Sequence, residues 1–282
     1  MKRTIIYLLV TLFLVACDNS NNKNSIFKDR NVERAVRKSL NYNDGQKIQL
    51  KDLESITEVW CSNCKDLSGL KYLHNLKLLC LGGCKIDDFS ELSELKSLKT
   101  LSLTNCKLTD IRFLNRLNTI EYLYLEVNRI KDISSIGSLK QLKELNVSHN
   151  YIKDISVLSK LPNIEIILMY NNLAEQLPDF SHCLNLKKLY LQDNSLVCNK
   201  NFYNLKQVKE ILLTSNKIDN IDWVTSLDSV HVVDLGDNPI NYKEAYKRVE
   251  MRNLIDKKIL ILDTDAQKKR SWWVRLINYC FD

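Results

Sequence analysis

The sequence predicts an α/β solenoid, with a parallel sheet on its concave face and short helical turns on its convex face. Segments like "LYLEVNRIKDISSIGSL" (residues 123–139) recur along the chain. In each of them the apolar residues are first two apart, as on a strand, and then three apart, as on a helical turn. The residue at this change of period recurs once after 20 residues and then seven times after 22 residues. A fixed period of this length over many copies is typical of a solenoid.

The change of period falls on an asparagine or a cysteine in every copy. The chain must bend sharply here, so that backbone groups lose their strand partners. An asparagine amide both donates and accepts hydrogen bonds and can satisfy such buried groups. Cysteine fits the same place as a small, weak donor that is easily buried. We call these residues the ladder positions: Cys64, Cys84, Cys106, Asn128, Asn150, Asn172, Asn194, Asn216 and Asn238.

Each copy reads L-x-x-L-x-L-x-x-(N/C)-x-I-x-x-I-x-x-L, which is a short strand followed by a turn that returns the chain. One copy cannot bury its own apolar face, so neighbouring copies must stack and share a core. An aspartate before the returning turn is predicted to cap it. A calcium site is not predicted, because calcium takes about six to eight oxygen ligands and each copy supplies one carboxylate. The capping residues are Asp88, Asp110, Asp132 and Asp154.

Two copies depart from this pattern on the convex side. The copy after Asn172 has Ala174 in place of isoleucine and Pro178 in its turn. The copy after Asn194 lacks the Asp-Ile pair. Both keep the 22-residue length. We therefore expect the stack to continue through them with differently shaped convex turns.

The 22-residue pattern resembles that of internalin-type leucine-rich repeat proteins. The segment "SIFKDRNVERAVRKSL" (25–40) is similar to their small helical N-terminal cap, and its apolar face consists of Val32, Ala35, Val36 and Leu40. The chain after the last ladder position resembles the C-terminal cap of leucine-rich repeat proteins. The resemblance covers residues 25–265; it implies the fold and specifies function only weakly. The matching cap residues are Asn238, Pro239, Ile240, Tyr246, Lys247, Leu262 and Asp263.

The N-terminus predicts a secretory signal followed by a lipid anchor. Lys2 and Arg3 precede an apolar run (5–16) that is too short to span a bilayer comfortably and is typical of a signal peptide. The run ends in Leu-Val-Ala-Cys (14–17), which resembles the bacterial lipobox. This resemblance implies that Cys17 is acylated, as by palmitate. An ordinary signal peptide that contains a cysteine is the alternative.

These features predict a bacterial cell-envelope protein that is anchored by its lipid on the periplasmic side of the inner or outer membrane. The polar segment "DNSNNKNS" (18–25) suits a flexible tether between membrane and domain. Asp18 resembles the retention signal of some enteric lipoproteins and slightly favours the inner membrane.

The predicted organisation has five parts. They are a signal peptide (1–16), a lipidated polar tether (17–25), an N-terminal cap (26–55), the repeats (56–240), and a C-terminal cap with a basic aromatic tail (241–282). Three prolines and six glycines, with no linker rich in either, argue against a second domain. The net charge of +7 does not indicate a nucleic-acid partner, and we expect a monomer.

Nine cysteines raise the question of metal, disulfides or free thiols. A zinc site needs about four converging ligands. The strand alternation points Cys80 outward and its neighbours inward, so we expect no metal. Adjacent ladder cysteines come within disulfide range, but we expect their side chains to run parallel and to stay mostly as free thiols. The remaining cysteines are Cys61 and Cys183, which replace core leucines, and Cys198 and Cys280, which have no assigned role.

The sequence contains no catalytic motif. Its four histidines are scattered, and neither a glycine-rich phosphate loop nor a G-x-S-x-G motif occurs. We therefore expect no enzymatic activity and no cofactor, and favour a protein-binding module. The alternative is an envelope structural or assembly factor that binds peptidoglycan or another glycan.

The predicted binding site lies on the concave sheet. Residues two, four and six before each ladder position point away from the core, because strand side chains alternate. Apolar patches with tyrosine or tryptophan on such a surface usually mark interaction sites. The alternatives are that the aromatic residues merely favour strands, or that binding uses the convex face or the tail segment "KKRSWWVR" (268–275). That tail suits a membrane surface or packing over the last repeat. The predicted contact residues are Trp60, Tyr122, Tyr124, Ile166, Leu168, Tyr170, Tyr190 and Leu212.

Overall fold

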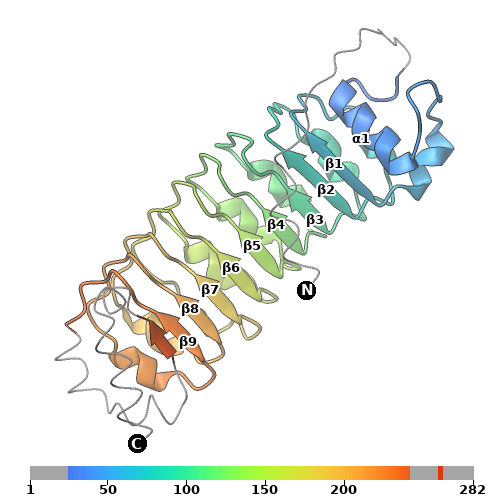
Figure 1. The fold of residues 1–282 in the computed structure, drawn as a ribbon. Coiled ribbons are helices and arrows are strands. Elements are labelled where there is room, and N and C mark those ends of the chain that lie inside the picture. Colours follow the sequence, from blue (N-terminus) through green and yellow to red (C-terminus); the bar gives the residue numbers. More distant parts are fainter. Residues whose placement is uncertain (1–24, 242–259, 263–282) are drawn as a thin grey trace, which may run out of the picture.

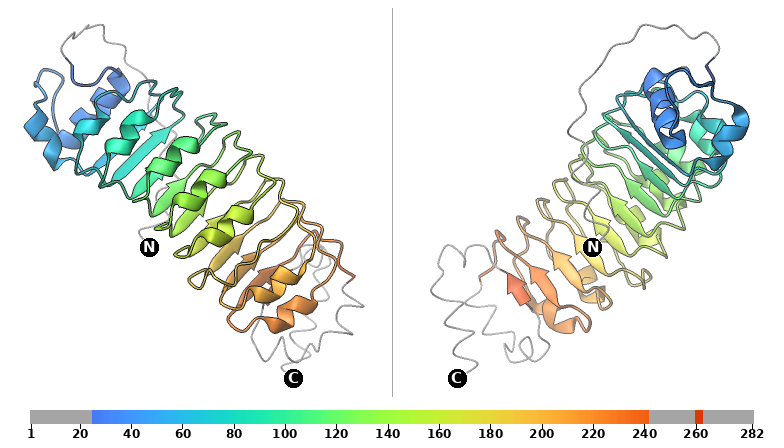
Figure 2. Two further views of the ribbon diagram at one scale, coloured as in Figure 1. Left: turned by 180° about the vertical axis from the view of Figure 1, so that it is seen from behind. Right: turned by 45° about the vertical axis from the view of Figure 1, so that its right-hand side comes forward.

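The protein is an elongated solenoid, with a parallel sheet along one side and short 3-10 turns along the other (Figure 1 and Figure 2). It is known from a computed structural model, which describes residues 25–241 and 260–262. The strands follow one another across the sheet in the order of the sequence, from β1 to β10, and each pairs in parallel with its neighbours. The predicted leucine-rich repeat solenoid is therefore confirmed.

The strands are short because each repeat contributes only the part of its length that precedes the ladder position. Equivalent residues pair across the sheet, as Tyr124 does with Asn146 and Asn146 with Leu168. The strands are β1 (Glu58–Ser62), β2 (Leu78–Gly82), β3 (Thr100–Ser102), β4 (Tyr122–Tyr124), β5 (Glu144–Asn146), β6 (Ile166–Leu168), β7 (Lys188–Tyr190), β8 (Glu210–Leu212), β9 (Val232–Asp234) and β10 (Leu260–Leu262).

Most of the returning turns are 3-10 helices. The predicted aspartates lie one residue before the N-cap position and accept a hydrogen bond from the first amide of the turn. Asp132 Oδ1 accepts a hydrogen bond from the Ser134 amide at 2.7 Å, and Asp154 Oδ1 accepts one from the Ser156 amide at 2.8 Å. This contact holds the pKa of Asp154 below its usual range. The helices are η1 (Leu50–Ser55), η2 (Leu70–Tyr72), η3 (Ser90–Glu94), η4 (Arg112–Arg116), η5 (Ser134–Ser138), η6 (Ser156–Lys160), η7 (Lys200–Asn204) and η8 (Asp222–Ser226).

The two departing repeats behave differently from each other. Between β6 and β7 the chain returns without a 3-10 helix, as expected for a turn that contains Pro178. The next repeat forms η7 like its neighbours, although it lacks the Asp-Ile pair. Asn199, which stands one position later than the aspartates, caps this helix, since its side chain accepts a hydrogen bond from the Asn201 amide at 3.0 Å. The turn of the second repeat thus keeps the 3-10 helix but begins differently, from an extended and side-chain-capped Asn199.

In the described part of the chain one α-helix, α1 (Arg30–Leu40), covers the first strand of the sheet (Figure 1). Val32 and Val36 on its apolar face are buried in the common core. Asp29 caps the helix by accepting hydrogen bonds from the amides of its first turn. Its second oxygen accepts one from the Lys65 amide at 2.6 Å. The N-terminal segment is therefore joined to the first repeat by polar and apolar contacts.

The ladder asparagines satisfy the backbone at the bend, as predicted. Asn150 is 5% exposed, and its Oδ1 accepts a hydrogen bond from the Ile130 amide at 2.9 Å. Its Nδ2 donates to the carbonyl oxygens of Leu125 and Val147, each at 3.0 Å. In its own repeat the Cys106 thiol takes the donor role and donates to the Leu81 carbonyl on β2.

The cysteine side chains at the first two ladder positions converge, and the expectation that they run parallel is wrong for this pair. Cys64 Sγ and Cys84 Sγ lie 2.7 Å apart. The reason is that each ladder side chain reaches back to the bend of the preceding repeat. Cys84 Sγ accordingly accepts a hydrogen bond from the Cys64 amide at 3.2 Å. The described cysteines are free thiols.

Several predicted features fall on residues outside the described part of the chain. They are the signal peptide, Cys17 and Asp18 at one end, and most of the C-terminal cap and the tail with Cys280 at the other. Within the described part, no helix has the length and apolar character needed to cross a bilayer.

Candidate functional site

The sheet face is formed by three columns of side chains that run across the strands. We use this name for the residues six, four and two before each ladder position. Register places Tyr124, Leu168, Tyr190 and Leu212 in the middle column, with Asn146 between the first two. Tyr122 and Ile166 lie in the column beside it, separated by Glu144.

The predicted contact residues differ in their exposure. Trp60, on the first strand, is 49% exposed. The other seven residues are half-buried. Asn146 is fully buried between its neighbours and divides the middle column. The structure therefore brings together two apolar groups: Tyr122 with Tyr124 on one side, and Ile166, Leu168, Tyr170, Tyr190 and Leu212 on the other.

Two tyrosine hydroxyls on this face are bound by glutamates on the next strand. Tyr124 Oη donates to Glu144 Oε1 at 3.1 Å. Tyr190 Oη donates to Glu210 Oε2 at 2.5 Å, and Lys188 Nζ lies 2.9 Å from the same oxygen. Burial, followed by this hydrogen bond, raises the pKa of Tyr190. These contacts hold the rings in place, which lowers the entropy cost of using them in an interface.

The sheet face is acidic on a chain whose net charge is +7. From β1 to β9, one cation, Lys188, stands in its three columns. The carboxylates of the same columns are Glu58, Glu126, Glu144, Glu210 and Asp234. A surface of this kind favours a partner with positive charge.

The column nearest the bend contains polar residues that the sequence did not single out as a site. Glu126 Oε1 accepts a hydrogen bond from Thr104 Oγ1 at 2.9 Å, but its other oxygen is buried without a partner. Ser148 is fully buried and its hydroxyl has no hydrogen-bond partner. His149 beside it bonds Asn171 at 2.7 Å instead. Ser148 and His149 therefore do not form a nucleophile–base pair.

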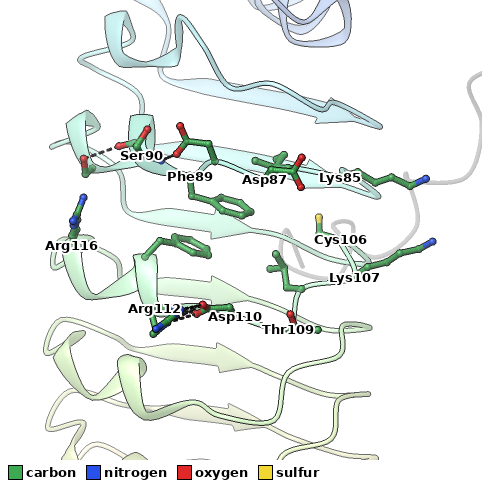
Figure 3. Close-up of a pocket in the computed structure, with 15 residues that line it drawn as sticks. Lys85, Asp87, Phe89, Ser90, Cys106, Lys107, Thr109, Asp110, Arg112 and Arg116 are labelled. Carbon is green, nitrogen blue, oxygen red and sulfur yellow. Dashed lines mark hydrogen bonds and ion pairs between the residues drawn. The ribbon is translucent and has the colours of Figure 1, made fainter.

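A hollow of ≈ 760 Å³ lies on the opposite side, between η3 and η4 (Figure 3). Phe89 and Phe113 stack inside it, with ring centroids 4.1 Å apart and planes 7° from parallel. Asp110 and Arg112 at its edge form an ion pair, and Arg116 also lines it. Phe89 and Phe113 stand at positions where most other repeats have smaller side chains. This difference is the feature of the sequence that could have indicated the hollow.

Metal ligands do not gather in the described residues. There, no group of three or more His, Cys, Asp or Glu side chains is arranged to hold a metal ion. The cysteines of the first repeats contact one another and backbone groups.

Comparison with known proteins agrees with the repeat architecture. The family "Leucine Rich repeats (2 copies)" matches residues 74–116, 96–138, 118–160 and 140–182. No protein of the curated set matches the chain in sequence. Among solved structures, internalin C2 from Listeria monocytogenes is 25% identical with a TM-score of 0.55, over 65% of this chain and 92% of that chain.

A leucine-rich repeat protein from Leptospira interrogans has the same fold. Its TM-score is 0.61 at 23% identity, over 76% of this chain and 62% of that chain. The repeat period, the asparagine ladder, the parallel sheet and these matches agree with one another. The chain has a leucine-rich repeat fold, its residues 74–182 match the leucine-rich repeat family, and it is similar in structure to internalin C2.

Proposed function

We propose that this protein is a lipid-anchored envelope protein whose sheet face binds a protein partner without catalysing a reaction. The leucine-rich repeat fold supports the general role of protein–protein interaction. The observation that carries the specific site is the half-buried apolar group around Leu168 and Tyr190, in which Glu210 binds the hydroxyl of Tyr190 and holds its ring. Tyrosines fixed in this way are typical of interface hot spots.

The double substitution Tyr124→Ala with Tyr190→Ala tests the sheet face. We expect it to weaken partner binding by at least 30-fold, because truncation of one hot-spot tyrosine costs about 2 kcal/mol or more. The measurement is a pull-down of envelope proteins, and separately of purified cell wall, with immobilised full-length protein. The captured protein is then titrated against each variant.

Tyr151→Ala is the matched control. Tyr151 follows a ladder position, is 52% exposed and lies outside the three columns of the sheet face. We expect this variant to bind like the parent protein. Circular dichroism should be unchanged in all variants. Undiminished binding by the double variant would refute the sheet-face site, and capture of cell wall alone would favour the glycan-binding alternative.

The anchor rests on the lipobox-like sequence that ends at Cys17. We expect Cys17→Ser to abolish incorporation of a radioactive or clickable fatty acid, because the acylated thiol is lost. It should also block removal of the signal segment by the lipoprotein route, so that the unprocessed chain accumulates. Cys198→Ser is the control and should leave labelling intact. Fatty-acid labelling that survives Cys17→Ser would contradict the anchor.

A further inference from the structure

Three buried oxygen atoms on the sheet face lack a hydrogen-bond partner. They are Glu126 Oε2, Ser148 Oγ and Gln192 Oε1. A further atom of this kind in the described part of the chain, Asp222 Oδ1, lies on η8 at the other side of the solenoid. Buried polar groups are almost always paired, so three exceptions on one face require an explanation.

The three residues lie in one row across adjacent strands. The Val127 amide donates to the Ser148 carbonyl at 3.1 Å, which sets Glu126 beside Ser148. The His149 amide donates to the Tyr170 carbonyl at 2.9 Å, which sets Ser148 beside Tyr170. The Asn171 amide donates to the Gln192 carbonyl at 3.0 Å, which sets Tyr170 beside Gln192. At about 4.8 Å per strand the row is roughly 14 Å long. We call it the acceptor row: Glu126, Ser148, Tyr170 and Gln192.

Backbone strain occurs at the same place. The residue before each ladder position has a positive φ, and it is Asn, Asp, Gly, Ser or His in the other repeats. Val127 has φ of 59° and is 46% exposed. A β-branched residue is strained in this conformation. Strain and unpaired polar groups that coincide in this way are typical of functional sites.

The functional groups of the acceptor row indicate which groups a ligand must supply to pair with them. A carboxylate oxygen and an amide oxygen only accept hydrogen bonds, and the serine hydroxyl can also accept one. The occupant must therefore supply donors. The charge of the sheet face makes a cationic donor the favoured one. Burial raises the pKa of Glu126, and the hydrogen bond from Thr104 opposes this rise.

We propose that the acceptor row binds a basic side chain, arginine or lysine, that the protein partner presents. This inference rests on the proposed function and narrows the partner to one with a cation next to apolar groups. The proposal requires the Glu126 side chain, which is only partly buried, to turn its free oxygen toward the surface when the partner binds. The half-buried Tyr170, next in the row, places an aromatic ring near the bound cation.

The test uses two peptides that differ at one group, a guanidinium that is replaced by an uncharged urea with fewer hydrogen-bond donors. One is a fluorescein-labelled nonapeptide with a central arginine between leucines, and the other has citrulline in place of arginine. Both are titrated against the purified full-length protein by fluorescence anisotropy. We expect the arginine peptide to bind at least ten-fold more tightly than the citrulline peptide. Equal affinities, or no binding of the arginine peptide, would overturn the proposal.

The variants then locate the site. We expect Glu126→Gln to weaken binding of the arginine peptide about ten-fold and to leave the citrulline peptide unchanged. The control Glu175→Gln removes the same charge from an exposed residue outside the sheet face, where Glu175 pairs with Lys153. It should bind like the parent protein. Equal losses in the two variants would indicate a general charge effect and refute the acceptor row.

Stability separates a binding role from a structural role. Glu126→Gln removes a poorly solvated charge and keeps an acceptor for Thr104, so we expect a Tm equal to or above that of the parent protein. Ser148→Ala, which removes a hydroxyl without a partner, should also keep the Tm while it weakens binding several-fold. A partner whose binding depends on Tyr124 and Tyr190 but not on Glu126 would refute this inference and leave the proposed function intact.

Discussion

Asn150→Ala is expected to destabilise the protein by about 3 kcal/mol, which corresponds to a fall in Tm of roughly 6–12 °C. The Ile130 amide would lose its partner, Asn150 Oδ1, in a buried position. The carbonyls of Leu125 and Val147 would each lose one bond but keep another, from the ladder asparagine of a neighbouring repeat. The unpaired amide therefore accounts for most of the expected loss.

Thermal unfolding followed by circular dichroism measures this effect. Lys153→Ala, in the same repeat, is the control. Lys153 pairs with Glu175 at 2.9 Å, but both side chains are more than half exposed, so its loss should change stability by no more than about 0.5 kcal/mol. Equal Tm values for the two variants would show that the ladder does not stabilise the bend.

Gly69→Ala is expected to have a similarly large effect at the N-terminal end. Gly69 has φ of 101°, and an added Cβ would lie 2.5 Å from the Ile26 carbonyl oxygen and 2.8 Å from the Phe27 ring. The close contact with backbone cannot be relieved by a change of rotamer. Strain and overlap each cost about 1–3 kcal/mol, so the segment that contains Phe27 should separate from the first repeat.

Limited proteolysis of the N-terminal segment, together with the Tm, tests this expectation. Gly82→Ala is the matched control, because an added Cβ at this position meets no atom within 4 Å. Gly82 lies on β2, where alanine is tolerated, and its variant should resist proteolysis like the parent protein. If Gly69→Ala is cleaved no faster than Gly82→Ala, the close packing between Gly69 and the N-terminal segment does not exist in solution.

The repeat period alone determined most of the fold. It identified the ladder residues, the inward leucines and the three outward columns, because a strand alternates its side chains and a stacked repeat places equivalent residues side by side. The capping role of Asp132 and the helical segment around Val32 and Val36 were predicted from local pattern in the same way. Each of these features depends on residues that are close in the sequence or separated by one period.

The candidate site was predicted only in outline. The repeat pattern predicted that Tyr124 and Tyr190 lie on the sheet face. It did not predict that Asn146 is buried between them, or that glutamates bind their hydroxyls. The hollow with Phe89 and Phe113 was not foreseen either.

Tertiary structure alone decided the remaining features. The convergence of Cys64 with Cys84 follows from the direction in which a side chain reaches toward the preceding repeat. The unpaired oxygen of Glu126 and the positive φ of Val127 are visible only in the structure. A one-dimensional period specifies which face a residue occupies. It does not specify rotamers, or whether a polar atom finds a partner at hydrogen-bonding distance, because these depend on the volumes and conformations of side chains about 22 residues away.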